Sequence, residues 1–113
     1  MRKSPLVSLR KRADFDRVFN LKKSAANKFF VVYAAPNNLP HNRLGLSVSK
    51  KVGCAVVRNR IRRLIKESLR LKEEISNGYD IIVIARANEI LPDALTKVNG
   101  SLSPLFGKLG LNG

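Results

Sequence analysis

A nearly continuous apolar run, residues 79–85, constrains the fold of this chain more than any other segment. Its sequence is Tyr-Asp-Ile-Ile-Val-Ile-Ala, which is too apolar for a strand with one face in water and predicts a buried central strand. Two further strands are predicted. Residues 29–35 are aromatic and β-branched, and residues 43–50 alternate with a period of two. The chain is therefore expected to build a sheet that helices must cover.

Two segments have apolar residues at helical spacing. Near residues 11–20, Phe15, Val18 and Phe19 predict a short amphipathic helix. From residue 56 to about residue 72, a longer helix is predicted with one stripe of residues for the core. That stripe comprises Ile61, Leu64, Ile65, Ser68 and Leu69.

A last helix is predicted after Pro92, which suits a first helical turn. Gly100 and Pro104 disfavour a regular helix, so we expect a kink or early fraying near Pro104 and a weakly helical end over about residues 100–113. The order helix, strands, helix, strand, helix predicts an α+β fold, a two-layer sandwich with a central mixed β-sheet packed by helices. At this length the chain is expected to form a single domain, residues 1–113.

The charge of the chain is large and unevenly placed. The net charge is +14 and the pI is about 10.8. Residues 1–72 hold 19 Lys and Arg against 3 acids, and residues 73–113 hold 3 against 5, so the first part carries +16 and the second −2. Such an excess repels itself in the compact state unless a polyanion is the usual neighbour. Nucleic acid is therefore the expected partner.

Cysteine usage and apolar run lengths disfavour several protein classes. Cys54 is a single cysteine and cannot form an internal disulfide, and one cysteine with one histidine, His41, cannot supply a zinc site with those ligand types alone. The basic N-terminal arm, about residues 1–10, runs into further charges before any long apolar stretch, unlike a signal peptide. No segment approaches the roughly 20 apolar residues of a membrane span. We expect a soluble, cytoplasmic protein without a membrane partner.

The predicted helix over residues 56–72 has a dense cationic face opposite its apolar stripe. Between residues 58 and 70, six cations face one acid, Glu67, so pairing between residues four apart cannot neutralise them. An ordinary solvated helix face is the alternative interpretation. Arginine forks match phosphate oxygens and Asn59 can add a directional contact, so polyanion binding explains the pattern better. The charges alone do not separate RNA from DNA.

Two motifs resemble a known family. The run Arg43-Leu-Gly-Leu-Ser-Val-Ser-Lys-Lys-Val-Gly53, followed by Arg58-Asn-Arg-Ile-Arg-Arg-Leu-Ile65, resembles the signature of the bacterial ribonuclease P protein subunit. The resemblance covers about residues 9–106. It implies a protein that works with a catalytic RNA, which uses bound magnesium to cleave the phosphodiester bond and remove the 5′ leader of precursor tRNA.

The resemblance also implies two binding surfaces. In the family the basic helix meets the catalytic RNA, which gives that role to Arg58, Asn59, Arg60, Arg62, Arg63 and Lys66. The family's groove for the leader lies between the first helix and the sheet. The residues expected there are the aromatics Phe15, Phe19 and Tyr33, with Arg12, Arg17, Lys28, Ser47, Ser49 and Lys50.

Pattern alone gives the aromatic residues a simpler interpretation. Without the family, core packing of Phe15 and Phe19 would be favoured, although the surrounding cations resemble a platform on which bases stack. Phe29, Val31 and Tyr33 are expected to share one face of their strand. Ser47 and Ser49 are expected to share that face on the neighbouring strand.

Several further expectations come from the resemblance only. The protein is expected to carry no catalytic residue, to leave magnesium mainly to the RNA, and to act as a monomer with one RNA subunit. The connection through the basic helix is expected to be left-handed, against the usual right-handed rule. The chain departs from the family pattern at Cys54, at Leu21-Lys22-Lys23, where a glycine is frequent, and at Gly100 with Pro104.

Three other functions would share some of these sequence features. A general RNA-binding module, such as a ribosomal protein or a nucleic-acid chaperone, would share the charge but not need an aromatic groove. A membrane-surface protein would use the basic amphipathic helix, yet the apolar stripe of that helix is needed for the core. A protein-only nuclease is disfavoured because the eight acids are scattered and form no cluster of the kind that holds nuclease metals.

Overall fold

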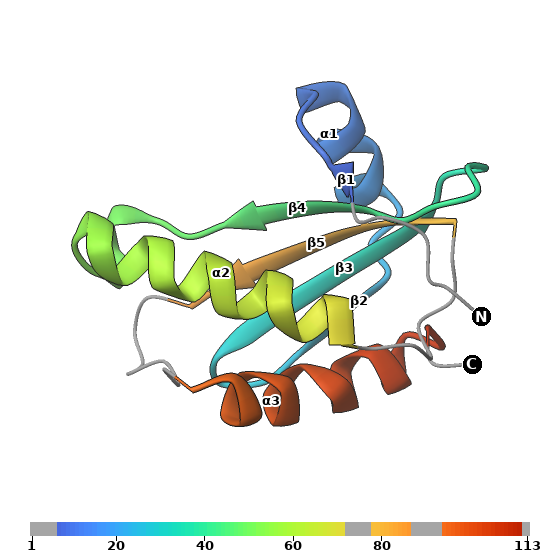
Figure 1. Ribbon diagram of the computed structural model, residues 1–113. Helices are drawn as coiled ribbons and strands as arrows, with labels where there is room; N and C mark the ends of the chain where they lie inside the picture. Colours follow the sequence, from blue (N-terminus) through green and yellow to red (C-terminus); the bar gives the residue numbers. More distant parts are fainter. Residues whose placement is uncertain (1–6, 72–77, 87–93, 112–113) are drawn as a thin grey trace.

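The described residues form a five-stranded mixed sheet in the computed structural model, which describes residues 7–71, 78–86 and 94–111 (Figure 1). The strands are β1 (Val7–Ser8), β2 (Ser24–Ala26), β3 (Phe30–Pro36), β4 (Arg43–Ser47) and β5 (Tyr79–Ala85), in the order β1-β4-β5-β3-β2. The strand β5 is central, parallel to β4 and antiparallel to β3. The buried strand predicted from residues 79–85 is confirmed with the same bounds.

The other strands differ from the predictions at their ends and in number. The strand β4 ends at Ser47, and a short 3-10 helix, η1 (Lys50–Val52), follows it. The strands β1 and β2 were not predicted, because runs of two and three residues are too short to show an alternating pattern. Through β1, part of the basic N-terminal arm lies at the edge of the sheet, parallel to β4.

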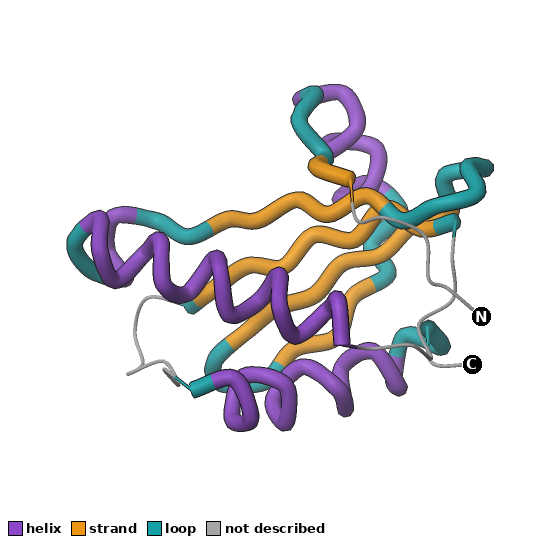
Figure 2. The backbone as a smooth tube through the Cα atoms, in the orientation of Figure 1, coloured by secondary structure: helices purple, strands orange, loops and turns teal. Residues whose placement is uncertain are grey.

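Two helices, α2 (Ala55–Leu71) and α3 (Leu95–Lys108), cover one face of the sheet (Figure 2). The stripe predicted for α2 is confirmed, since all five of its residues are buried. Ser68 is among them, and its hydroxyl lies 2.9 Å from Oδ1 of Asn99 on α3. The sequence therefore fixes which side of α2 faces the core and which side faces water.

The helix α3 corrects one prediction. The prediction of early fraying near Pro104 is wrong, because the helix continues to Lys108. Pro104 is exposed, while Leu102, Leu105 and Phe106 are fully or almost fully buried. Burial of this apolar face outweighs the hydrogen bond that the proline removes. Pro92, expected in the first turn, lies outside the described residues.

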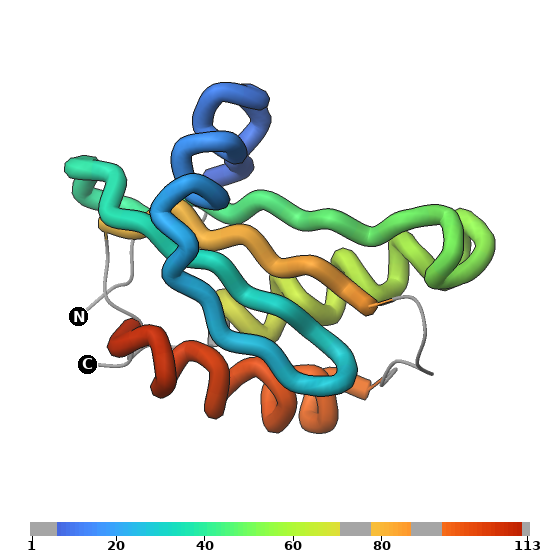
Figure 3. Tube along the Cα trace, turned by 180° about the vertical axis from the view of Figure 1, so that it is seen from behind, coloured from blue at the N-terminus to red at the C-terminus, as the bar shows by residue number. Residues whose placement is uncertain are grey.

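The remaining helix, α1 (Arg12–Asn20), packs on the opposite face of the sheet at one end. Figure 3 views the molecule from behind. In this view the strands lie in front of α2, and α1 lies at one end of the sheet. Here Val18 is fully buried in a small cluster with Leu9, Ala35 and Ile82. The α+β prediction with a mixed sheet is confirmed, and the left-handed sense of the β4–α2–β5 connection stays a prediction. Among the described residues no helix is both long and apolar enough to span a membrane.

A buried carboxylate ties α1 to the sheet. Asp80 of β5 is fully buried, and its Oδ1 accepts hydrogen bonds from Arg43 Nε at 2.7 Å and from Asn37 Nδ2 at 2.9 Å. Its Oδ2 accepts one from Arg43 Nη2 at 2.6 Å and a short one from Nη2 of Arg17 on α1. Arg43 also lies near Asp14 of α1, with 3.4 Å between Nη1 and Oδ2. We name Asp80, Arg17, Arg43 and Asn37 the Asp80 cluster.

The Asp80 cluster shifts the titration of its members. Burial alone raises the pKa of the Asp80 carboxyl, but hydrogen bonds from Arg43, Asn37 and Arg17, with the positive charge of Arg43, hold that pKa below its ordinary value. The hydrogen bond to Asp80 raises the pKa of Arg43 in turn. The carboxylate is therefore ionised and paired in the folded protein at neutral pH.

Replacing Asp80 with Ala is expected to lower the free energy of unfolding by about 3 kcal/mol, the low end for breaking a buried ion pair, because both arginines keep some access to water. Urea unfolding at neutral pH measures the loss. The control variant Asp16→Ala, which removes an exposed acid of α1, should change the free energy of unfolding by less than about 0.5 kcal/mol.

The pH dependence gives the second half of this prediction. A lowered folded-state pKa contributes stability that is complete above the unfolded pKa of about 3.9 and is lost as the pH falls through the folded value. The difference between the wild type and Asp80→Ala should therefore narrow below about pH 4. A difference that stays constant through that range would contradict the assigned charge state.

Candidate nucleic-acid interface

The helix α2 presents a cationic face to water because its opposite stripe is buried in the core. Glu67 is the one acid between residues 55 and 71. Of the residues expected to meet RNA, Asn59, Arg60, Arg63 and Lys66 are exposed, and Arg58 and Arg62 are partly buried. The structure therefore brings all six predicted residues onto one accessible helix.

Two side chains of this face are already oriented within α2. Arg62 Nη1 donates a 2.9 Å hydrogen bond to Oδ1 of Asn59, which holds the guanidinium along the helix surface. Nε of Arg58 is buried and has no hydrogen-bond partner in the described part of the chain. A buried donor without a partner is costly, so an acceptor supplied by a ligand would be favourable there.

Three half-buried aromatic side chains form a continuous surface where α1 meets the sheet. The ring centroids of Phe15 and Phe19 are 6.4 Å apart, and those of Phe19 and Tyr33 are 4.9 Å apart with the rings at 90°. All three pack against the small cluster around Val18, yet each keeps part of its surface in water. Core packing of Phe15 and Phe19 is thus confirmed in part, and stacking of bases on their accessible surface stays a prediction.

A glycine of β4 makes room for Phe15. A Cβ atom placed on Gly45 would lie 2.5 Å from Cζ of the Phe15 ring, closer than side chains tolerate. Gly45 therefore lets the helix α1 approach the sheet at this point. Gly45 belongs to the run Arg43–Gly53 that carries part of the family resemblance, but only the structure shows that Phe15 is its neighbour.

Beyond α1 the same face of the sheet is open. Strand register places Ser47 of β4, Ile84 of β5 and Val31 of β3 in one row, and Tyr33 lies in the next row. The expectation that Ser47 lies on the strand next to Tyr33 is wrong, because β5 runs between β3 and β4. Ile84 was missed for that reason.

Two residues near this face differ from the sequence-based expectation. Phe29 precedes β3 and packs against the main core on the other side of the sheet, so it does not share a face with Tyr33. Ser49 is exposed but follows the end of β4. The open face therefore consists of Phe15, Phe19, Tyr33, Val31, Ile84 and Ser47, and we name it the aromatic strip.

The cations expected around the aromatic strip occupy different places. Arg12 is exposed at the start of α1. Lys28 and Lys50 are exposed at the other end of the strip, where β3 begins and β4 has ended, and Lys28 Nζ lies 4.9 Å above the Phe29 ring. Arg17 is engaged by Asp80 and by the carbonyl oxygen of Pro36 at 2.8 Å. Its first role in this structure is to hold α1.

The described residues offer little protein-based chemistry. No group of three or more His, Cys, Asp or Glu side chains in the part that the structure describes could hold a metal ion. Cys54 is exposed just before α2, where hydrogen bonds from the backbone of Val57 and Val56 lower the pKa of its thiol. Arg58 adds a smaller effect in the same direction. The Asp80 and Asp14 carboxylates are occupied by arginines.

Comparison with known proteins gives a consistent assignment. A family model described as Ribonuclease P matches residues 4–110. The ribonuclease P protein component of Thermoanaerobacter sp. (strain X514) is 48% identical over 95 residues, which cover 83% of this chain and 82% of that protein. That of Clostridium kluyveri is 45% identical over 106 residues, covering 91% and 94%.

Solved structures agree with the sequence comparison. The RNase P protein of Staphylococcus aureus superimposes with a TM-score of 0.79 at 39% identity, covering 98% of this chain and 100% of that one. The RNase P protein of Thermotoga maritima gives a TM-score of 0.73 at 36% identity, covering 84% and 90%. The chain belongs to the ribonuclease P protein family and is a protein component of this tRNA-processing endoribonuclease.

Proposed function

We propose that this protein uses two separate surfaces in precursor tRNA processing. The cationic face of α2 binds the ribonuclease P RNA, and the aromatic strip binds the 5′ leader of the precursor. The observation that carries the proposal is their placement, because the two surfaces lie on opposite faces of one sheet. One protein molecule can then contact both RNAs at once.

Charge and exposure support RNA binding by α2. The residues Arg58, Arg60, Arg62, Arg63 and Lys66 are cationic, and the helix holds one acid. Phosphate contacts release counterions and give strong, salt-dependent binding without reading sequence. Asn59, which accepts from Arg62, keeps its amide N–H groups for a further contact.

The shape and chemistry of the aromatic strip support leader binding. Bases stack on aromatic faces whatever their sequence, and cations at the two ends of the strip can follow the phosphates. Arg12 lies at one end, and Lys28 and Lys50 at the other. A surface of this kind suits single-stranded leaders of different sequence.

The chemical step belongs to the RNA in this proposal. Magnesium, held mainly by the RNA, supplies the metal-assisted hydrolysis, and a single protein molecule acts with one RNA subunit. The described residues do not fit a metal site of their own, since no acid cluster is present among them. The contribution of the protein is to bind and orient the two RNAs.

Cleavage of a precursor tRNA at low magnesium by a bacterial ribonuclease P RNA, with and without this protein, tests the function. Addition of the protein is expected to restore correct 5′ cleavage. Binding of both RNAs without any effect on cleavage would instead favour a general RNA-binding module.

Changing Arg62 and Arg63 together to Ala is expected to weaken binding of the ribonuclease P RNA. Loss of roughly two phosphate contacts should flatten the log–log salt dependence by about 1.8. The matched control is Lys97→Ala with Lys108→Ala, which removes two exposed cations from α3 and should leave the slope unchanged. An equal change in both pairs would mean that only total charge matters.

Changing Phe19 and Tyr33 to Leu should weaken binding of precursors with long leaders. Each lost stack costs about 1–3 kcal/mol, roughly a 5- to 150-fold loss of affinity. A precursor with a one-nucleotide leader provides the control, because it cannot reach the strip and should bind equally to both proteins. Equal losses for long and short leaders would remove the aromatic strip from the leader path.

A further inference from the structure

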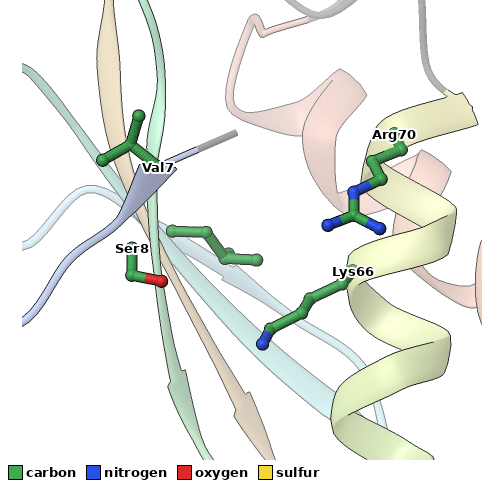
Figure 4. A pocket seen from close by; sticks show the side chains of 5 residues that line it. Val7, Ser8, Lys66 and Arg70 are labelled. Carbon is green, nitrogen blue, oxygen red and sulfur yellow. The ribbon is translucent and has the colours of Figure 1, made fainter. Parts of the chain in front are cut away.

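A small open cleft separates β1 from the C-terminal half of α2. Val7 and Ser8 of β1 form one wall, Lys66 and Arg70 of α2 form the other, and Leu44 of β4 lies between them. Its free volume is about 60 Å³. Figure 4 shows the Lys66 and Arg70 side chains extending from α2 toward Val7 and Ser8. The cleft is on the face of the sheet that α2 covers, opposite the aromatic strip.

The charges of the cleft are one-sided. Lys66 and Arg70 are one helical turn apart on α2, a spacing at which like charges repel. Both are exposed, and among the described residues no acid lines the cleft. The ion pairs of Asp80 and Asp14 lie across the sheet and cannot compensate them. Two cations that extend into one hollow favour an anion between them.

Polar groups of β1 complete the hollow. The hydroxyl of Ser8 faces α2 in Figure 4 and can donate a hydrogen bond. The N–H of Val7 donates to the carbonyl oxygen of Asn42, just before β4, at 3.3 Å, and the N–H of Leu9 donates to that of Leu44 in β4 at 2.9 Å. The intervening N–H of Ser8 therefore points to the free edge of the sheet.

The anion that suits this arrangement is a phosphodiester group. An arginine fork, a lysine and a hydroxyl together satisfy the oxygens of a phosphate, and the apolar groups of Val7 and Leu44 limit the hollow to a compact ligand. The cleft also continues the row of cations on α2. Between residues 58 and 70 that row spans about 18 Å along the helix axis.

We propose that Lys66, Arg70 and Ser8 form a phosphate-binding cleft that takes one backbone phosphate of the ribonuclease P RNA between β1 and α2. The inference rests on the proposed function and extends it to Arg70 and Ser8, which the motif over residues 58–66 does not include. It gives the short edge strand β1 a binding role. It also makes Lys66 and Arg70 partners in one contact instead of two independent contacts.

The salt dependence of RNA binding separates one shared phosphate from two. With one shared phosphate, Lys66→Ala and Arg70→Ala alone should each change the log–log slope little, and the double variant should flatten it by about 0.9. Ser8→Ala should weaken binding with the slope unchanged, since the hydroxyl carries no charge. Additive single changes of about 0.9 each would overturn the shared site.

The pair Arg62→Ala and Arg63→Ala serves as the internal reference. If that pair flattens the slope and the Lys66 and Arg70 double variant does not, the cleft is wrong and the proposed function stands. If neither double variant changes the slope, RNA binding by α2 itself fails. If the Lys66 and Arg70 double variant instead loses binding to vesicles containing phosphatidylserine while its RNA slope stays the same as that of the wild type, the ligand of the cleft is a lipid surface and not RNA. In that case the cleft proposal is overturned.

A second measurement uses inorganic phosphate and the free protein. Titration at constant ionic strength should move the backbone amide signals of Val7, Ser8 and Leu44 in a saturable way. The same titration of the Lys66 and Arg70 double variant should leave those signals in place. Equal movement in the two proteins would show that phosphate does not occupy the cleft.

Discussion

The arrangement of this protein depends on one buried charge. Asp80 is the second residue of the otherwise apolar strand β5, and it accepts hydrogen bonds from Arg17 of α1, Arg43 of β4 and Asn37 after β3. Val18 is the one residue of α1 that is buried, so apolar packing alone holds this helix weakly. Because Phe15 and Phe19 stand on the same helix, the Asp80 cluster also sets where the aromatic strip lies. A charge that is structural in origin thus determines the geometry of a binding surface.

The central sheet separates two kinds of contact. On one face, the large apolar cluster with α2 and α3 fixes the cationic helix and leaves its charges in water. On the other, a much smaller cluster leaves most of the face beyond α1 open. In the proposed function, α2 contacts phosphates without reading sequence, and stacking on the aromatic strip tolerates any base. Under that proposal, specificity for the substrate comes from the relative placement of the two RNAs on opposite faces of the sheet.

Sequence patterns correctly predicted the elements that bury a full apolar face. They failed where a helix end, the strand order or a side-chain partner depends on tertiary contacts. The helical spacing of apolar residues in α2 correctly predicted its five core residues and the cations opposite them. In this helix the residues that recur at helical spacing are the ones that the core buries. The helix α3 was expected to kink or fray early near Pro104, and early fraying is wrong because local propensity does not show the burial of Phe106 and its neighbours. The position of Ser47 relative to Tyr33 depends on strand order, which no local pattern contains. The contact of Arg17 with Asp80 was not predicted, because a cation near aromatic residues has no local marker that shows a partner 63 residues away.

Two positions of this chain differ in how far a backbone constraint reaches. Lys22 follows α1 with φ at 56°, where a non-glycine residue costs roughly 1–2 kcal/mol. That cost is local and the remaining packing offsets it. Gly45 is different, because any side chain there would meet the Phe15 ring at 2.5 Å. Relief of that clash would move Phe15 and the helix that bears Phe19 and Arg17. Such a displacement would change the aromatic strip and the Asp80 cluster together, whereas the strain at Lys22 stays local.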